Sequence, residues 1–203
     1  MTVIESPDQL PEIYGPVSAV ARDKAIDHLD RHARAFIALS PFLILGSAEA
    51  GGPADVSPKG DAPGFVAVLD GKTLAIPDRL GNNRTDSIRN ILANPHVALI
   101  FLVPGRTECL RVAGRARIET DPALLADLAV HGKTPRSAIV VAVDEVFLHC
   151  GKAVIRAKLW HPEAQVGKDA LPSLGAMLAD QIAGIDPDAT EAAIEDGYRK
   201  RLY

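Results

Sequence analysis

The sequence predicts a small antiparallel β-barrel with helices packed on its outside. Three observations support this prediction: about six short strand-forming runs follow one another, aromatic residues make up only 4% of the chain, and short helical segments stand between the runs. At 203 residues, the chain fits one domain with terminal extensions. We expect an N-terminal arm at 1–17, a barrel domain with a leading helix at 18–165, and a C-terminal loop and helix at 166–203.

The first regular element is expected to be a single helix at 19–39, because its apolar residues recur at helical spacing. Ser40-Pro41 ends this helix, since proline disfavours helical backbone in the residue before it. Extended segments are then expected at 42–48, 54–58, 65–70, 72–77, 96–104, 108–119 and 137–150. Asp70-Gly71 suits a tight hairpin between two of them, because both residues tolerate positive φ.

Two of the extended segments have patterns that predict which faces are buried. The segment 96–104 is apolar enough to be buried on both faces. The segment 108–119 alternates with a period of two, which predicts a strand with one buried face. Its polar face carries Arg111, Arg115 and Arg117, and we interpret the last two as solvated charges.

Short helices are predicted between and after the strands. Helical segments are expected at 85–92, 151–160 and 188–199, with a loop at 161–172. A further short helix is expected to begin at Asp121-Pro122, since an acidic N-cap followed by proline is a typical helix start.

Composition and charge exclude several functional classes. Apolar residues make up 47% and charged residues 24%, as in soluble globular proteins, so neither disorder nor a membrane class is indicated. A net charge of −4 argues against a general nucleic-acid binder. We see no secretory signal and no apolar stretch of the ~18 residues that a membrane helix needs. Cys109 and Cys150 fit no metal or redox spacing, so we interpret both as buried thiols in a reducing cytoplasm and predict no metal site.

The candidate binding segment runs from Ser57 to Asn90. It contains four cationic residues, Lys59, Arg79, Arg84 and Arg89, interleaved with the neutral donors Ser57, Asn82, Asn83, Thr85 and Ser87. A guanidinium can bind phosphate bidentately and an ammonium acts as a point charge. The start of the predicted helix at 85–92 would add free backbone N–H groups. We interpret this segment as the anchor for the phosphate of flavin mononucleotide (FMN).

Four runs of the chain carry a family resemblance when taken together: SPKGDAPGFV, IPDRLGNNRTDSIRNILANP, FLVPGRTECLRVAGRARI and FLHCGKAVIRAKLW. Over about 18–165 the chain resembles the pyridoxamine 5′-phosphate oxidase superfamily, and within it a branch of probable FMN-dependent enzymes. The resemblance implies a mainly β protein with peripheral helices, an antiparallel, Greek-key-like split β-barrel. It also implies a homodimer with two FMN molecules at the interface, each touching both subunits.

The resemblance implies two groups of FMN contacts. The first group, along the flavin, ribityl and phosphate, is Val56, Ser57, Pro58, Lys59, Pro77, Asp78, Arg79, Asn83, Arg84 and Ser87. The second group, on a later strand or reaching the partner's FMN, is Arg111, Lys152, Arg156 and Trp160. Asn83 stands at one of the oxidase's paired basic positions, so Arg79 or Lys59 is expected to supply more of the charge. Cys109 falls near a glutamine of the oxidase and cannot replace its amide donor well.

These observations predict a cytoplasmic FMN-dependent oxidoreductase in which the flavin performs the redox chemistry, with a small-molecule substrate or a nicotinamide donor. No side chain need act as nucleophile or general base, so no catalytic residue is assigned. The Arg-x-His arrangement expected for the vitamin phosphate is missing, so pyridoxamine phosphate oxidase activity itself is not predicted.

Three alternatives remain open from the sequence. The protein could be a non-catalytic FMN-binding protein for storage or sensing, or its split barrel could hold a deazaflavin or haem. Trp160 could either cover the flavin or fill the dimer seam.

Overall fold

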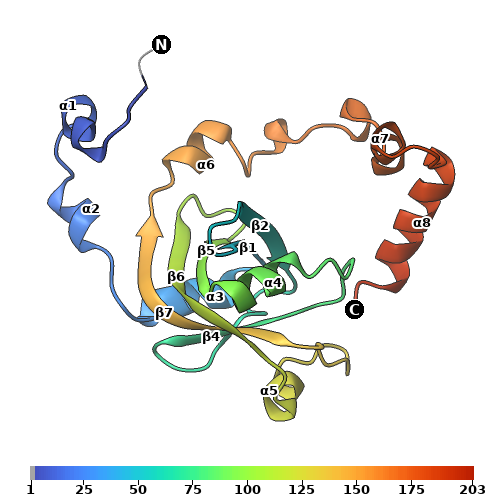
Figure 1. Ribbon diagram of the computed structural model, residues 1–203, viewed down its shortest axis with the longest axis horizontal. Coiled ribbons are helices and arrows are strands. Elements are labelled where there is room, and N and C mark those ends of the chain that lie inside the picture. The colour runs from blue at the N-terminus through green and yellow to red at the C-terminus, as the bar shows by residue number, and fades with distance from the viewer. Residues whose placement is uncertain (1–2) are drawn as a thin grey trace.

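The computed structural model describes residues 3–203, which form a seven-stranded antiparallel sheet with helices around it (Figure 1). The strands are β1 (Phe42–Ala48), β2 (Ala54–Gly60), β3 (Ala67–Val68), β4 (Thr73–Pro77), β5 (His96–Leu102), β6 (Cys109–Glu119) and β7 (Ala138–His149). Their order across the sheet is β2-β1-β5-β6-β7-β4-β3. The hairpins β1–β2 and β3–β4 therefore flank the meander β5–β6–β7. The predicted antiparallel architecture is confirmed.

Eight α-helices occur in the same part of the chain. They are α1 (Leu10–Tyr14), α2 (Ala19–Asp23), α3 (Arg31–Leu39), α4 (Asp86–Ala93), α5 (Pro122–Asp127), α6 (Lys152–Ala157), α7 (Leu174–Gln181) and α8 (Pro187–Lys200). Single 3-10 turns lie at Pro7–Gln9, Pro162–Ala164 and Lys168–Ala170. Figure 1 shows α1 and α2 on one side of the barrel and α7 and α8 on the other. No helix from residue 3 onward has the length and apolarity to cross a membrane.

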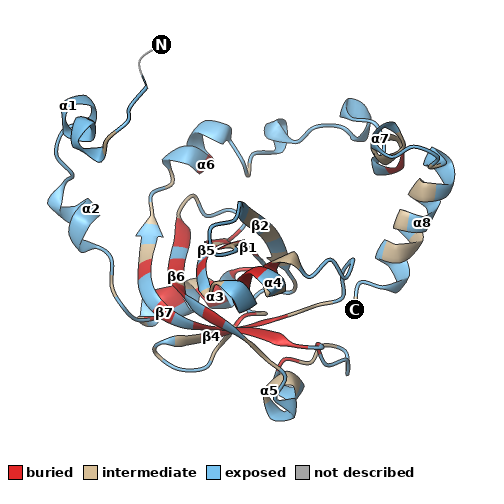
Figure 2. Cartoon of the chain, in the orientation of Figure 1, coloured by how far each residue is buried: buried red, intermediate tan, exposed pale blue. Residues whose placement is uncertain are grey.

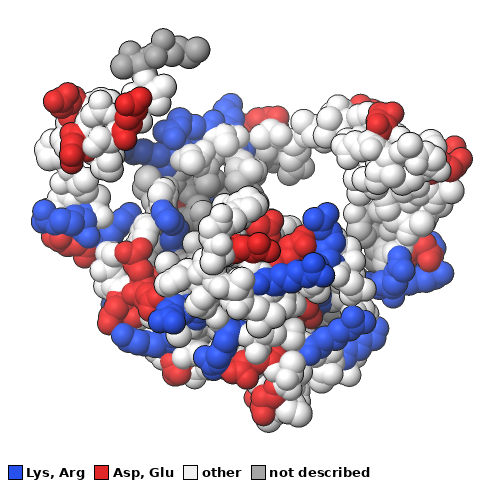
Figure 3. Space-filling view, in the orientation of Figure 1, with Lys and Arg blue, Asp and Glu red and all other residues white. Residues whose placement is uncertain are grey.

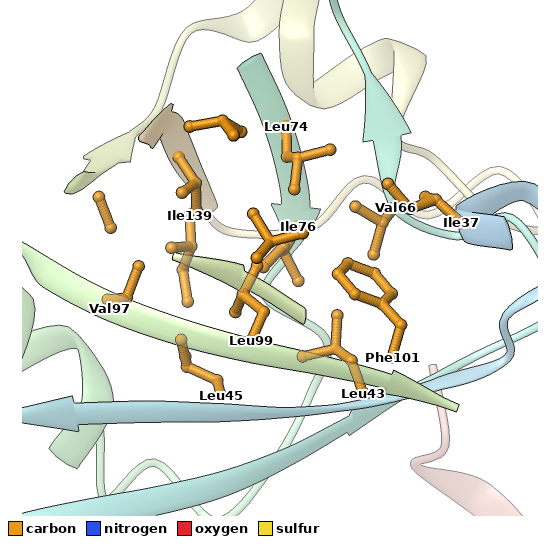
Figure 4. Packing of buried hydrophobic residues seen from close by; sticks show 14 of the residues in the cluster. Ile37, Leu43, Leu45, Val66, Leu74, Ile76, Val97, Leu99, Phe101 and Ile139 are labelled. Carbon is orange, nitrogen blue, oxygen red and sulfur yellow. The ribbon is translucent and has the colours of Figure 1, made fainter. Parts of the chain in front are cut away.

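The core lies inside the curved sheet and is closed by α3 and α4. Strand residues alternate between core and outside, as the period of two requires. Figure 4 shows Leu43, Leu45, Leu99 and Phe101 pointing into one space with Ile76. Burial is concentrated on the strands, while the N-terminal segment is almost entirely exposed (Figure 2). Residues 1 and 2 of the predicted arm lie outside the described part.

The prediction that 96–104 is buried on both faces is wrong. Val97, Leu99 and Phe101 of β5 are buried, whereas Ala98 is exposed and Ile100 is half-buried. The outer face of β5 is thus apolar but uncovered in the single chain. The alternation predicted for β6 is confirmed, with one bulge between Ala113 and Gly114.

The single helix predicted at 19–39 is also wrong, because the chain is extended in its middle. Ile26 pairs with Val146 of β7 through two backbone hydrogen bonds of 2.9 and 2.7 Å. A new helix, α3, then begins at Asp30, whose carboxylate accepts hydrogen bonds from the backbone N–H groups of His32 and Ala33. An aspartate N-cap of this kind is a strong helix start.

The predicted turn at Asp70-Gly71 is present but has another geometry. Neither residue has positive φ. The Asp70 carboxylate accepts from the backbone N–H of Lys72 at 2.6 Å, and the Leu69 N–H donates to the Thr73 carbonyl. An aspartate side chain bonded two residues ahead is an alternative way to fix a turn.

The C-terminal part contains one helix that was predicted and one that was not. The helix expected at 188–199 is present as α8. Helix α7 had no counterpart among the predicted elements. Its start is set by Ser173, whose hydroxyl accepts from the backbone N–H of Ala176.

Candidate functional site

A wide hollow of about 1770 Å³ lies between the barrel and the C-terminal helices. Its barrel side is formed by β2, the end of β4, the loop 78–85, the start of α4 and the turn 133–137 before β7. Its far side is formed by α7, α8 and residues 201–203. In Figure 1, α8 stands away from the sheet while the chain end returns toward the barrel. The volume exceeds the ~300–1,000 Å³ usual for ligand pockets, so the hollow has room for more than one small molecule.

This hollow gathers ten of the fourteen residues that the resemblance assigned to FMN. They are Val56, Ser57, Pro58, Lys59, Pro77, Asp78, Arg79, Asn83, Arg84 and Ser87. The other four, Arg111, Lys152, Arg156 and Trp160, are not among its lining residues.

Strand β2 contributes one wall as an edge strand of the sheet. Ser57 and Lys59 are half-buried on one face of the strand, and Val56 and Pro58 are exposed on the other. An edge strand tolerates Pro58, because no second neighbour needs its missing N–H. Within residues 3–203, the Lys59 ammonium has neither a hydrogen bond nor an ion pair, so its charge is available to a ligand.

The loop that leads into α4 is held in an uncommon conformation. Asn83 and Thr85 have φ of 60° and 58°, in the left-handed region that few non-glycine residues adopt. The Asn82 side-chain oxygen accepts from the backbone N–H of Arg84 at 3.1 Å. Thr85 occupies the N-cap position but its hydroxyl caps nothing, and instead donates to the Arg84 carbonyl. The first N–H groups of α4 are therefore left without a side-chain cap, which favours an anion there.

Arg84 and Ser87 lie on either side of this helix start. The Arg84 side chain is 73% exposed, and its Nε donates to the Asp86 carboxylate at 2.8 Å. Ser87 is buried on the inner side of α4. One turn further along, Asn90 donates to the Ser47 hydroxyl of β1, which fixes the helix to the barrel.

The two residues at the end of β4 have structural roles. Pro77 is buried, and the backbone N–H of Asp78 donates to the Ser137 carbonyl at 3.0 Å. This bond continues the β4–β7 pairing and brings the turn 133–137 beside the loop 78–85.

Arg79 is engaged inside the protein. Its Nε pairs with the Asp61 carboxylate at 2.7 Å, and its Nη1 donates to the Leu128 carbonyl at 2.9 Å. The Asp61 side chain is 1% exposed and also accepts from the Tyr203 hydroxyl at 2.6 Å and from the Ala62 N–H. Burial acts to raise the pKa of Asp61, but these hydrogen bonds and the Arg79 charge outweigh it and lower that pKa. Arg79 was expected to supply charge to the phosphate, but its bonds to Asp61 and Leu128 do not favour that role.

The four remaining predicted residues lie around β6 and α6. Arg111 packs over the Phe147 ring, 4.9 Å from its centroid. Lys152 and Arg156 are exposed on α6, and the Trp160 indole N–H donates to the Arg106 carbonyl at 2.7 Å. Within one chain, none of them reaches the hollow.

The two cysteines lie at adjoining strand ends and differ in exposure. Cys109 is buried as predicted and stands opposite His149 in the β6–β7 register. The pKa of the Cys109 thiol is raised, mainly by burial and to a smaller extent by the nearby negative charge of Glu108. The prediction that Cys150 is buried is wrong, because β7 ends at His149 and leaves Cys150 exposed.

The sequence interpretation missed two parts of the hollow. One is the turn before β7, where Lys133 donates to the Tyr203 carbonyl at 2.9 Å and Arg136 donates to the Asn83 side-chain oxygen at 3.3 Å. The other is an apolar wall from Leu174, Leu178, Ile185, Ala189, Ala193 and Ile194. The i, i+4 spacing of Ile185, Ala189 and Ala193 was a readable signal for that wall.

The charge of the hollow differs in sign from that of the whole chain. Six basic residues and four acidic ones line it, while the chain carries a net charge of −4. Figure 3 shows basic side chains on both sides of the gap between the barrel and the end of α8. A locally positive, partly apolar hollow suits an organic anion.

The chain was compared with known families and structures. Residues 29–150 match the family described as pyridoxamine 5′-phosphate oxidase. Similar solved structures include HupZ of Group A Streptococcus, with a TM-score of 0.48 at 19% identity, covering 59% of this chain and 92% of that one. An FMN-binding protein from Syntrophomonas wolfei has a TM-score of 0.45 at 12% identity, covering 57% of this chain and 82% of that one. An F420 reductase has a TM-score of 0.41 at 20% identity, covering 57% of this chain and 94% of that one. Among curated proteins, none matches the chain.

The family match agrees with the resemblance found in the sequence. It includes every strand from β1 to β7 and the whole barrel side of the hollow. Since it spans more than half of the chain, this protein belongs to the pyridoxamine 5′-phosphate oxidase family, a family of split-barrel proteins.

Proposed function

We propose that this protein is an FMN-dependent oxidoreductase whose flavin phosphate binds beside the loop 78–85 and the start of α4. The observation that carries this proposal is the hollow itself, which brings together ten residues that the family resemblance assigns to FMN. These residues come from β2, β4, the loop 78–85 and α4, so chain folding and not sequence proximity alone unites them.

The residues present fit a phosphate group. The uncapped start of α4 offers backbone N–H donors, and Arg84 and Lys59 offer positive charge on two sides. Arg84 lies beside Asp86 and is well exposed, so its remaining N–H groups can reach an incoming phosphate. Arg79 instead fixes Asp61 and the Leu128 carbonyl, and so keeps the loop in place.

The ring system of a flavin finds apolar surface in the same hollow. Val56 and Pro58 of β2 are exposed there, and Phe65 is half-buried nearby. A bound flavin supplies the redox chemistry, while the protein binds and orients it. We place the substrate or nicotinamide donor in the remaining space toward α7 and α8.

The residues that line the hollow suit a flavin better than a haem. Histidine, cysteine and methionine are the usual axial ligands of haem, along with tyrosine. Among the described residues, the lining includes no histidine, cysteine or methionine. Its two tyrosines are Tyr198 and Tyr203, and the hydroxyl of Tyr203 is bonded to Asp61.

We further propose a homodimer in which Arg111, Lys152, Arg156 and Trp160 approach the partner's flavin. One supporting observation is the apolar outer surface around β1 and β5, where Phe42 is exposed and Ile100 is half-buried. The other is that none of the four residues assigned to the partner's flavin lines the chain's own hollow. Light scattering coupled to gel filtration tests the dimer: a mass of one chain at micromolar concentration would contradict it.

The phosphate assignment is tested by replacing Arg84 with alanine. We expect Arg84→Ala to weaken FMN binding by about 1–3 kcal/mol, the value of a charged hydrogen bond, in a fluorescence titration. Arg115→Ala is the matched control, because Arg115 is exposed on β6 and lies outside the hollow. An unchanged dissociation constant for Arg84→Ala would remove Arg84 from the site.

A further inference from the structure

Asn83 and Arg136 both line the hollow and are joined by a hydrogen bond. The Arg136 Nη1 donates to the Asn83 side-chain oxygen at 3.3 Å, although the two residues are 53 positions apart in sequence. Both line the hollow, and both are exposed to it. The contact is possible because the β4–β7 pairing places the turn before β7 beside the loop 78–85.

Three of the other cationic side chains that line the hollow already have partners within the protein, whereas Lys59 has none among residues 3–203. Arg79 is held by Asp61 and the Leu128 carbonyl, Arg84 is paired with Asp86, and Lys133 donates to the Tyr203 carbonyl. Arg136, by contrast, makes no ion pair with any residue from 3 to 203. A guanidinium has five N–H donors, and the bond to Asn83 uses one of them. The others are free to meet an anion.

Asn83 also stands at a position where the resemblance implies a basic residue. An asparagine carries no charge, but its side-chain oxygen can hold a charged donor by a hydrogen bond. Asn83 has a left-handed backbone, with φ of 60°, and lies next to Arg84, just before the start of α4. Through this hydrogen bond, Asn83 holds the guanidinium of Arg136, from another part of the chain, beside the loop 78–85.

We propose that Arg136 is the second guanidinium of the phosphate site, beside Arg84, and that Asn83 is its positioning residue. This inference rests on the proposed function, because it names a residue of the same FMN site. Arg136 contacts the phosphate through its free N–H groups, and Asn83 acts only by orienting Arg136.

The test compares FMN with riboflavin, which has the same ring and ribityl chain but no phosphate. Dissociation constants for both are measured with the wild-type protein, Arg136→Gln and Arg136→Lys. We expect Arg136→Gln to lower the preference for FMN over riboflavin by about 10- to 100-fold while riboflavin binding stays within twofold. Arg136→Lys should restore part of the preference, because an ammonium keeps the charge but loses the fork geometry.

Arg115→Gln is the control for loss of one positive charge, since Arg115 is an exposed arginine outside the hollow. It should leave the preference unchanged. If Arg136→Gln also leaves the preference within twofold of wild type, Arg136 does not contact the phosphate and the inference is overturned. If the wild-type protein binds neither compound, the proposed function fails first, and that outcome is distinct.

The positioning role of Asn83 is tested by a double-mutant cycle. Asn83→Ala should lower the FMN preference less than Arg136→Gln does, and the double variant should be no worse than Arg136→Gln alone. Additive losses in the double variant would mean that Asn83 acts independently of Arg136.

Discussion

Replacing Arg79 with methionine is expected to lower the free energy of unfolding by about 3–4 kcal/mol. The side chain of Arg79 is 16% exposed and that of its partner Asp61 is 1% exposed, so the change leaves a buried carboxylate without its counter-ion. Breaking a buried pair from one side costs about 3–5 kcal/mol. Asp61 keeps its hydrogen bonds from Tyr203 and Ala62, which places the expected cost toward the lower end of that range. The lost bond to the Leu128 carbonyl adds about 1 kcal/mol.

Urea denaturation of the protein without FMN measures this change directly. The variant Arg79→Met/Asp61→Leu is the informative companion, because removing both charges should recover much of the loss. A change below about 1 kcal/mol for Arg79→Met would refute the structural role of Arg79. It would also return Arg79 to the candidates for phosphate contact.

Three other predictions concern the barrel and the pH response. Phe101→Ala should destabilise the protein by about 3–5 kcal/mol in the same urea assay, because Phe101 is fully buried in the core; a loss under 1 kcal/mol would contradict the packing described. Gly114→Ala should prevent normal β6–β7 pairing, since an added Cβ would collide with the Ala142 carbonyl; a native circular dichroism spectrum and an unchanged melting temperature would argue against this. The pKa of Asp61 is lower in the folded protein than its ordinary value near 4, so its contribution to stability is present above that value and is lost as the pH falls through the folded pKa. Asp61→Asn should therefore flatten the fall in stability below about pH 4, and a parallel acid profile for both proteins would count against the assignment.

Much of the barrel could be predicted because its signals are local. The alternation in β6 and the acidic cap of α5 depend on neighbouring residues, and both are found where they were expected. The break in the helix predicted at 19–39 had one local signal, because Asp30 is the N-cap residue of α3. The pairing of Ile26 with Val146, however, is a long-range contact that a local pattern does not predict.

The site was predictable in outline but not in its charge assignments. Within the segment 57–90, residues 57–60, Phe65 and 77–88 line the hollow, whereas Arg89 is not among the lining residues. Which cation is free depends on partners far along the chain: Arg79 meets Leu128, and Arg136 meets Asn83. Pairings across such separations follow from strand order, which the spacing of residues does not reveal.

The C-terminal wall was missed for a similar reason. Tyr203 bonds to Asp61 and Lys133, two residues on the barrel that are distant in sequence, and these bonds bring the end of α8 beside the hollow. Only the apolar spacing on α8 was readable beforehand, and it does not say which surface the helix faces.

The central claim is that the hollow binds FMN, and the visible absorption spectrum of the purified protein tests it most directly. The released chromophore is identified by mass, and protein purified without colour is titrated with FMN. The account predicts a flavin spectrum with FMN released, or saturable binding of added FMN. A protein that is colourless and does not bind added FMN, or that releases a deazaflavin or haem instead, would contradict it.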